Sequence, residues 1–313
     1  MNESAIEVKN VTKIFEEVSA LDNISFKVRK NTIFGLVGPD GAGKTTMIRI
    51  MCGLLRADSG EVDFTGLDLG EGKKKSIIKN EIGYLSQKFS LYTDLTVDEN
   101  IQFIADIHGV KDFEKRRDEL LHFTRLKDFR HFQAGKLSGG MKQKLALACT
   151  LIYRPKIIFL DEPTTGVDPV SRREFWVILS GLLKENITIL ISTPYMDEAE
   201  RFNYIVMMNN GKVISEGTPT DIKSSLKLAI MEVVCSPVRD AYKILKNIEN
   251  SDIQMFGDRL NIVFKGKSME LEEISVLLKK NNIEIDDIRM KLPSLENVFI
   301  ELMENDNDES DGQ

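Results

Sequence analysis

The chain has 313 residues, which is enough for one large domain and a small one, since a domain usually holds about 100 to 200 residues. Hydrophobic residues make up 42% and charged residues 29%, a composition that excludes a disordered or fibrous protein. The net charge is −7, but much of it lies in an acidic end formed by Glu304, Asp306, Asp308, Glu309 and Asp311. The remainder is nearly neutral and lacks the basic field of a nucleic-acid-binding protein, so we expect no nucleic acid partner.

No stretch of the sequence predicts a membrane-spanning segment. The most apolar runs, residues 145–153 and 187–191, are shorter than the roughly 20 residues that cross a bilayer. The N-terminus lacks the basic start and apolar run of a secretory signal. The three cysteines, Cys52, Cys149 and Cys235, are widely spaced among apolar residues, which suits buried thiols in a reducing compartment. These features together predict a cytoplasmic protein.

The first two thirds of the chain predict an α/β domain. Residues 6–36 contain three strand-like runs, and the third is the most apolar and ends in glycine. Apolar residues then recur at helical spacing from Met47 to Leu54, and a longer helical pattern covers residues 89–153. Strands return at 156–163, 186–193 and 204–214. Strands that alternate with helices predict a mostly parallel sheet covered on both faces.

A different pattern begins after residues 217–225. It predicts a strand at 228–234, a helix at 238–249, two strands within 252–265, a helix at 268–281, a strand at 283–290 and a final helix. The order β-α-β-β-α-β is typical of a small ferredoxin-like α+β domain. We therefore predict a large domain at 1–222, a small domain at 226–304 and a disordered acidic tail at 305–313.

A phosphate-binding loop follows the third strand. The residues that fit G-x-x-x-x-G-K-[ST], with the threonine that follows, are Gly38, Pro39, Asp40, Gly41, Ala42, Gly43, Lys44, Thr45 and Thr46. Glycines let backbone N–H groups face phosphate oxygens, Lys44 adds a positive charge, and Thr45 offers a hydroxyl to Mg²⁺. The position between a buried strand and a helix favours this interpretation over a chance glycine-rich turn. The motif predicts a binding site for ATP and Mg²⁺.

Two acids end the strand at 156–163. The apolar run Ile157–Leu160 delivers Asp161 and Glu162 to the carboxyl edge of the sheet, where ligands bind in open α/β folds. Asp161 is predicted to hold Mg²⁺, and Glu162 to act as general base toward the attacking water. The alternative is an acid pair that simply faces solvent, but a phosphate loop requires such a carboxylate.

A third motif narrows the class. Its residues are Leu137, Ser138, Gly139, Gly140 and Met141, ahead of a helical pattern. Ser138 is a good N-cap, and the two glycines allow close backbone approach to an anion at the positive end of the helix. The motif resembles the signature of the ABC ATPase family. The resemblance implies an antiparallel β subdomain, a helical subdomain near 89–153, and a head-to-tail dimer in which this signature contacts the nucleotide of the other subunit.

The resemblance covers residues 5 to about 220 and assigns further roles. Phe15 is similar to the aromatic residue that stacks on adenine. Gln87 is similar to the glutamine that reaches Mg²⁺ and the attacking water and links to the membrane partner. Asp168 is similar to the D-loop acid that communicates across the dimer.

Residues 88–100 combine a cap with a candidate contact surface. Thr96 and Glu99 fit a capping box, whereas the family often places a partner-facing acid nearby, and both roles can coexist. Phe89 and Tyr92 lie on the preceding predicted loop and look exposed. The resemblance implies that the membrane subunit docks there.

The sequences of residues 137–146, 163–169 and 292–299 resemble those of ATP-binding subunits in the bacterial ABC-2 exporter class. That class implies an ATPase that lies against the inner face of the membrane and powers outward transport of drugs, lipids or polysaccharides. The implied partners are a transmembrane permease and a second ABC ATPase subunit, identical or different. Another alternative is a soluble ABC ATPase that acts in translation or repair. Such a protein would carry a second ATPase domain, a long coiled coil or basic arms, and the sequence shows none of these.

The sequence departs from the family in two places. Pro194 stands where the family has a histidine that contacts the γ-phosphate, and no histidine follows His131. Asp40 stands where asparagine is commoner and would repel a triphosphate unless it points away. We hypothesise that the chain's own ATP site is slow or degenerate, whereas its intact signature completes a competent site on a different ABC partner. In that case the chain is a nucleotide-gated clamp.

Overall fold

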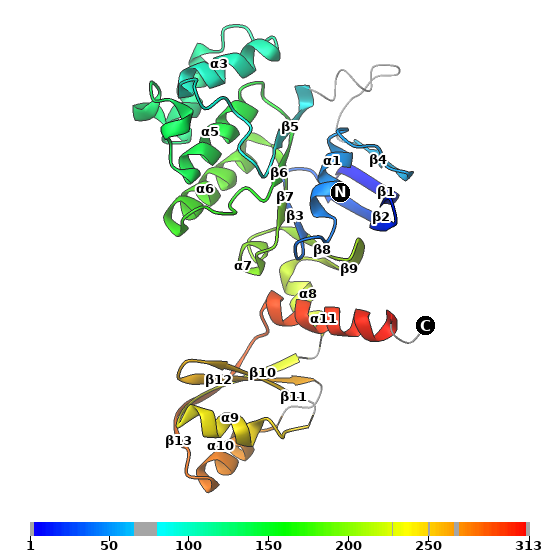
Figure 1. The fold of residues 1–313 in the computed structure, drawn as a ribbon, viewed down its shortest axis with the longest axis vertical. Helices are drawn as coiled ribbons and strands as arrows, with labels where there is room; N and C mark the ends of the chain where they lie inside the picture. The colour runs from blue at the N-terminus through cyan, green and yellow to red at the C-terminus, as the bar shows by residue number, and fades with distance from the viewer. Residues whose placement is uncertain (1–2, 66–79, 227, 250, 266–268, 311–313) are drawn as a thin grey trace. The chain divides into compact units, whose positions relative to one another are not determined.

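The computed structural model describes residues 3–65, 80–226, 228–249, 251–265 and 269–310. The chain divides into two compact units, Met1–Thr218 and Pro219–Gln313 (Figure 1). Residues 219–222 were expected in the first domain. They instead begin helix α8 (Pro219–Ser225), which contacts helix α11 (Leu295–Ser310) of the second unit.

The first unit contains a six-stranded sheet and a three-stranded sheet. Its strands are β1 (Ser4–Phe15), β2 (Val18–Arg29), β3 (Ile33–Val37), β4 (Ser59–Asp63), β5 (Ile82–Leu85), β6 (Ile157–Asp161), β7 (Thr188–Thr193), β8 (Tyr204–Asn209) and β9 (Lys212–Gly217). The larger sheet has the order β5-β6-β7-β3-β8-β9 and is parallel except for β9, which runs antiparallel to β8. The predicted mostly parallel sheet is thus confirmed.

The three central strands of the larger sheet carry the candidate site at one edge. Every residue of β3, β6 and β7 is buried, as expected for strands covered on both faces. Strand β7 lies between β3 and β6 and pairs in parallel with both. The carboxyl ends of the three strands therefore meet at one edge, where the phosphate loop and the acid pair both begin.

The described helices of this unit lie beside the phosphate loop, in the segment predicted to be helical, and after strands β6 and β7. They are α1 (Lys44–Met51), α3 (Val97–Ile107), α4 (Glu114–Phe123), α5 (Gly139–Leu151), α6 (Pro169–Leu182) and α7 (Met196–Ala199), with 3-10 turns η1 (Lys127–Phe129), η2 (Ala134–Lys136) and η3 (Leu183–Glu185). The predicted helical segment at 89–153 contains α3, α4 and α5. In the described ranges no helix is long and apolar enough to cross a membrane.

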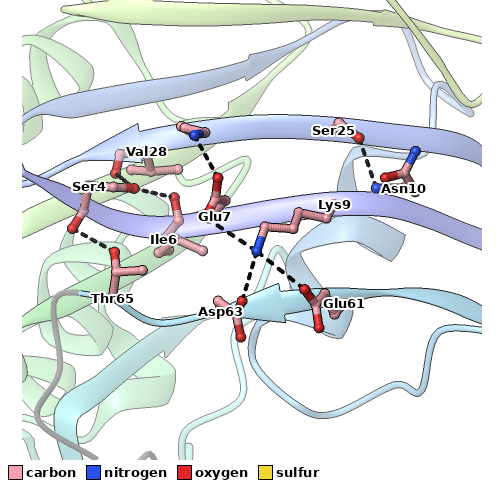
Figure 2. Close-up of polar contacts among 11 residues, drawn as sticks. Ser4, Ile6, Glu7, Lys9, Asn10, Ser25, Val28, Glu61, Asp63 and Thr65 are labelled. Atoms are coloured by element: carbon pink, nitrogen blue, oxygen red, sulfur yellow. Dashed lines mark hydrogen bonds and ion pairs between the residues drawn. The ribbon is translucent and has the colours of Figure 1, made fainter.

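The three-stranded sheet, of order β2-β1-β4, is antiparallel. Its apolar face shares one core with α1 and with the larger sheet, through residues such as Ile6, Met47 and Phe159. On its polar face Lys9 lies 3.3 Å from Glu61 and 3.2 Å from Asp63, and also contacts Glu7 (Figure 2). These charges join β1 to β4 at the surface, where each pair stabilises the sheet only slightly.

The second unit has the strand and helix order that the sequence predicted. Its elements are β10 (Leu228–Ser236), α9 (Val238–Leu245), β11 (Ser251–Phe256), β12 (Arg259–Lys265), α10 (Leu271–Lys280) and β13 (Glu284–Lys291), followed by α11. The sheet order is β11-β12-β10-β13, with antiparallel neighbours throughout. Helices α9 and α10 share a core with one face of this sheet. The arrangement is the split β-α-β pattern of ferredoxin-like domains.

Two predicted boundaries in this unit, the end of α9 and the start of the disordered tail, differ from the structure. Helix α9 ends at Leu245 rather than at residue 249, and α10 begins at Leu271, whereas the predicted start at 268 lies outside the described residues. The backbone of α11 is helical to Ser310, although a disordered tail was expected from residue 305. A run of acids favours solvent, but it does not prevent a helix whose earlier turns are anchored by Leu295, Val298 and Phe299.

Buried polar groups in the second unit centre on Glu232 of β10. Its side chain is 2% exposed, and Oε1 accepts a hydrogen bond from Arg289 Nη2 at 2.7 Å. Lys291 and Arg259 also contact this carboxylate. Hydrogen bonds from Lys291 and Arg289 hold the pKa of Glu232 below its usual value. The charged form is therefore favoured in the folded protein, and this contribution to stability is present above the usual pKa of glutamate and is lost as the pH falls through the lower folded pKa.

Replacing Glu232 with glutamine should lower the free energy of unfolding by about 2 kcal/mol at pH 7, because charge-assisted hydrogen bonds in a buried position are lost. The difference from the unmodified chain should narrow as the pH falls below about 4.5, where the unfolded carboxylate gains its proton. Urea denaturation at a series of pH values measures both effects. Glu284→Gln, which changes an exposed carboxylate on the same sheet, is the control. An equal effect of the two substitutions at pH 7 would contradict the argument.

Candidate nucleotide-binding site

The predicted phosphate loop connects β3 to α1 and lines a cavity of about 290 Å³. The loop residues Gly41 and Gly43 have φ angles of +83° and +97°, which favour glycine. Gly43 is the N-cap of α1 and provides no side-chain hydrogen bond to its first turn. The helix start is therefore open to an anion. The residues around the cavity are Ala20, Asp40, Gly41, Ala42, Gly43, Lys44, Thr45, Thr46, Gln87 and Glu162.

Lys44 is held inside this loop. Its side chain is 3% exposed, and Nζ donates to the carbonyl oxygens of Gly38 and Pro39, both at 2.8 Å. The same nitrogen lies 3.4 Å from Glu162 Oε1. The structure thus brings together the predicted phosphate-binding lysine, the first residue of α1, and the predicted general base, which follows the last residue of β6. Asp40, the departure from the family pattern, is exposed.

Asp161 joins three elements through its carboxylate. Oδ1 accepts hydrogen bonds from Thr45 Oγ1 at 3.0 Å and from Ser192 Oγ at 2.7 Å. A threonine hydroxyl and a carboxylate are the hard oxygen ligands that Mg²⁺ prefers. Within the described ranges no group of three or more His, Cys, Asp or Glu residues could hold a metal ion. The pair Thr45 and Asp161 therefore fits a magnesium ion whose other ligands are phosphate and water oxygens, as is usual for this metal.

Glu162 is fixed in an unusual backbone conformation. Its φ is +48°, and its N–H points to both Ser192 O at 3.2 Å and Ser192 Oγ at 3.0 Å. Its Oε2 accepts hydrogen bonds from Gln87 Nε2 at 2.8 Å and from Thr165 Oγ1 at 3.3 Å. Left-handed backbone in a non-glycine residue costs free energy and persists where surrounding contacts hold it. The contacts aim this carboxylate toward Lys44 and Gln87.

Sequence reasoning missed Ser192 and Thr193 as members of the site. Ser192 contacts both acids, and the carbonyl oxygen of Thr193 accepts from the N–H of Gly38 at 3.3 Å. The available signal was a pair of hydroxyl residues that ends an otherwise apolar strand. Such residues at the carboxyl edge of a parallel sheet lie beside any ligand bound there.

The signature segment starts α5, as the sequence predicted. Ser138 is the N-cap, and its side chain accepts from the N–H of Met141 at 3.3 Å. A Cβ on Gly140 would meet Ser171 Cβ of α6 at 2.4 Å, so only glycine fits at this position. The first turn of α5 thus lies directly against α6. The contact of Leu137, Ser138, Gly139, Gly140 and Met141 with a second subunit's nucleotide stays a prediction.

Asp168 and Phe15 occupy the accessible positions that their predicted roles require. Asp168 caps α6, and hydrogen bonds from the Ser171 side chain and backbone and from the Val170 N–H hold its pKa below the usual value. Phe15 ends β1 with a side chain that is 45% exposed, and Lys13 Nζ lies 5.3 Å from its ring centre. An exposed ring face is what base stacking needs. Adenine stacking and communication across a dimer stay predictions.

The capping box at the start of α3 is confirmed. Thr96 Oγ1 accepts from the N–H of Glu99, and Glu99 accepts in return from the N–H of Thr96. On the preceding loop Tyr92 is 54% exposed and lies edge-on to Phe103, with ring centres 4.8 Å apart. Phe89, expected to be exposed, is half-buried, because its ring lies beside Lys142 of α5. Tyr92 is the more accessible of the two predicted contact residues.

Pro194 follows the last residue of β7 and is half-buried in a bend. It carries no side-chain donor, and the next N–H, that of Tyr195, bonds to Thr193 Oγ1 at 3.1 Å. The turn is therefore satisfied internally, and nothing in it replaces the histidine that the family resemblance leads one to expect.

A phosphate loop after one central strand, with a carboxylate pair at the end of another, defines a P-loop nucleoside triphosphatase. The signature at the start of α5 and the three-stranded antiparallel sheet narrow that class. A family model described as ABC transporter matches residues 21–165. The chain belongs to the ABC transporter family of ATP-binding proteins, as similarity over nearly its whole length shows.

The chain is 31% identical over 311 residues to the "Daunorubicin resistance ATP-binding protein DrrA3" of Streptomyces coeruleorubidus, covering 98% of each chain. It is 41% identical over 225 residues to the "Probable multidrug ABC transporter ATP-binding protein YbhF" of Escherichia coli (strain K12). That match covers 71% of this chain but 38% of the relative, so the chain spans well under half of that protein's length. Among solved structures, a dimeric bacterial ABC transporter cassette matches with a TM-score of 0.60 and 30% identity, over 68% of this chain and 98% of the cassette.

Two glycine substitutions in the phosphate loop should separate backbone strain from steric overlap. An alanine at Gly43 would place Cβ 2.5 Å from the carbonyl oxygen of Ala20, whereas nothing lies within 4 Å of the corresponding atom at Gly41. Gly41→Ala should therefore cost about 1 kcal/mol of backbone strain, and Gly43→Ala clearly more. Thermal unfolding and the affinity for a fluorescent ATP analogue measure the difference. Equal losses in the two variants would contradict this account of the loop.

Proposed function

We propose that this chain binds ATP with Mg²⁺, hydrolyses it, and powers export through a separate transmembrane permease. The observation that carries the proposal is the constellation of Lys44, Thr45, Asp161 and Glu162 at one edge of the sheet, with Gln87 bonded to Glu162. The names of relatives support the exporter assignment, since they include a daunorubicin resistance protein and a probable multidrug transporter component. The chain then lies at the inner face of the membrane, as in the ABC-2 exporter class.

The side chains divide the reaction between them. The loop N–H groups and Lys44 bind the phosphates, and Thr45 and Asp161 would hold Mg²⁺, which would neutralise phosphate charge when bound. Gln87 and Glu162 lie 2.8 Å apart and together orient the attacking water, whose proton Glu162 Oε1 or Oε2 accepts. Ser192 keeps Asp161 and Glu162 in place through its hydroxyl.

A second subunit completes the proposed assembly. The signature residues at the start of α5 contact the nucleotide of the opposite subunit in a head-to-tail dimer, and the similarity to a dimeric cassette supports this arrangement.

Pro194 favours a second candidate function for the isolated chain. Because the turn after β7 lacks a donor toward the γ-phosphate, the chain acts as a nucleotide-gated clamp whose signature completes a faster site on a different ABC partner.

Steady-state ATP hydrolysis by the purified chain tests the two candidates. We expect slow turnover, abolished in Glu162→Gln because the variant cannot accept the proton of water, a loss of about 100-fold or more. Pro194→His should raise turnover if the missing donor limits the reaction. Phosphate release at saturating ATP and Mg²⁺ is the measurement.

Fast hydrolysis by the unmodified chain, abolished in Glu162→Gln, would rule out the degenerate-site candidate. Equal turnover of the unmodified chain and the Glu162→Gln variant would contradict the role given to Glu162. An unchanged rate in Pro194→His would assign the slow step to something other than the absent histidine.

The proposed permease contact lies where the loop after β5 meets α3 and α5. A small cavity of about 170 Å³ opens there, and its walls include Lys88, Phe89, Leu91, Ile104 and His108. Exposed Tyr92 and Phe103 stand next to it in the fold. Asn100, fully buried, fixes the loop by hydrogen bonds to both backbone groups of Tyr92, at 3.0 Å each. A mixed polar and apolar surface with exposed aromatic side chains suits a partner helix or loop.

Tyr92→Ala should reduce the fraction of the tagged chain that sediments with membranes of its host, because an exposed aromatic anchor is lost from the interface. The expected loss is about tenfold in affinity. Val177→Ala, which shortens an exposed apolar side chain on α6, is the matched control. Equal sedimentation of the two variants would place the permease contact elsewhere.

A further inference from the structure

Glu198 is a buried carboxylate that the proposed reaction does not use. It belongs to α7, and its side chain is 1% exposed. Its Oε1 accepts a hydrogen bond from Thr164 Oγ1 at 2.5 Å, and its Oε2 accepts one from Thr193 Oγ1 at 2.8 Å. Arg172 Nε lies 3.6 Å from Oε1. A buried charge is tolerated only with such partners, so the position of Glu198 is defined by all three.

The contact of Glu198 with Thr193 leads back to the phosphate loop. The carbonyl oxygen of Thr193 accepts from the N–H of Gly38, while its hydroxyl donates to Glu198 and accepts from the N–H of Tyr195. Thr193 therefore connects the start of the phosphate loop to Glu198. It does so immediately before Pro194, which has no donor of its own.

The contact of Glu198 with Thr164 leads to the segment that follows the acid pair. Thr164 lies two residues after Glu162, and its neighbour Thr165 donates to Glu162 Oε2. The same segment ends at Asp168, the cap of α6. One carboxylate thus holds residues 163–168 against the end of β7.

The third contact adds α6. Arg172 stands in the second turn of that helix, and its guanidinium lies over the ring of Tyr195 at 4.9 Å. Its buried Nε has no hydrogen bond of good geometry, so its attraction to Glu198 is electrostatic. The cluster therefore joins the turn after β7, the segment 163–168 and α6.

We propose that Glu198 is a positioning residue for ATP hydrolysis, which fixes residues 163–168 and the turn at Pro194 relative to the phosphate loop. The proposal rests on hydrolysis at the Lys44 and Glu162 site. The side chain of Pro194 cannot reach toward Glu162 with a donor, and the link Thr193–Glu198–Thr164 connects the same two segments by another route. Loss of the link lets Glu162 and Asp168 shift without removing any group that binds phosphate.

Glu198→Gln and Glu198→Ala test this in the full-length chain. Hydrogen exchange by mass spectrometry should show about tenfold faster exchange in residues 163–168 and 193–195, with α1 unchanged. Single-turnover hydrolysis of radiolabelled ATP, with protein in excess, should slow by about tenfold or more, since small misplacement of a catalytic group is costly. The dissociation constant for a fluorescent ATP analogue should change by less than about threefold.

Asp197→Asn is the control, because Asp197 is the adjacent carboxylate on α7 and its side chain is 74% exposed. Its Oδ2 lies 4.0 Å from Arg172 Nη1, an exposed ion pair that contributes little. It should leave exchange, affinity and rate unchanged. Thr164→Val combined with Glu198→Ala should be no slower than Glu198→Ala alone, since both remove the same link.

Unchanged exchange in residues 163–168 overturns the proposal, as does a rate constant that falls only in proportion to ATP affinity. If Glu198→Ala does not fold, Glu198→Gln, which keeps the size of the side chain, decides. An unmodified chain with no measurable hydrolysis contradicts the proposed function, and the exchange pattern then decides the role of Glu198 by itself.

Discussion

The carboxylate of Asp161 is the interaction on which the site depends. It is 1% exposed and accepts hydrogen bonds from Thr45 at the start of α1 and from Ser192 at the end of β7. A buried carboxylate without donors is strongly unfavourable, so these two hydroxyls also fix where the helix begins and where the strand ends. The N–H of Glu162 then bonds to the same serine, and its side chain meets Lys44 and Gln87. The placement of Glu162, the proposed general base, thus follows from the hydrogen bonds that satisfy Asp161.

The parts of the fold that could be predicted from the sequence are those that depend on residues close together in the chain. Fully buried strands such as β3 and β6 are apolar runs, and the residues that follow them must reach the edge of the sheet. The capping box of Thr96 and Glu99 is likewise a contact between residues three apart. Helix ends were less predictable, because apolar spacing continued past Leu245 and the acids after Glu304 hid the length of α11. Composition alone cannot distinguish a charged helix from a charged coil.

The parts that could not be predicted depend on contacts between distant segments. Ser192 and Asp161 are 31 residues apart, and Thr164 and Glu198 are 34 apart. In the sequence these are ordinary hydroxyl residues and one acid among several in residues 197–200. Their hydrogen bonds form only because β6 and β7 pair in parallel and bring both strand ends to one edge. The half-buried state of Phe89 arises in the same way, since Lys142 reaches it from α5.

Pro194 ends strand β7 without providing a side-chain donor toward the γ-phosphate. In the family that the sequence resembles, a histidine at this position provides that donor. Proline removes an N–H at a point where the strand stops, so it leaves no unsatisfied donor, and Tyr195 N–H and Thr193 satisfy each other. The architecture of the turn therefore does not need a histidine, whereas chemistry at the γ-phosphate does. The signature at Ser138 lies on α5, and its capping hydrogen bond is internal to that helix. In the second candidate function, a chain built this way supports a partner's site fully while its own site stays slow, and the proposed dimer then has two unequal subunits.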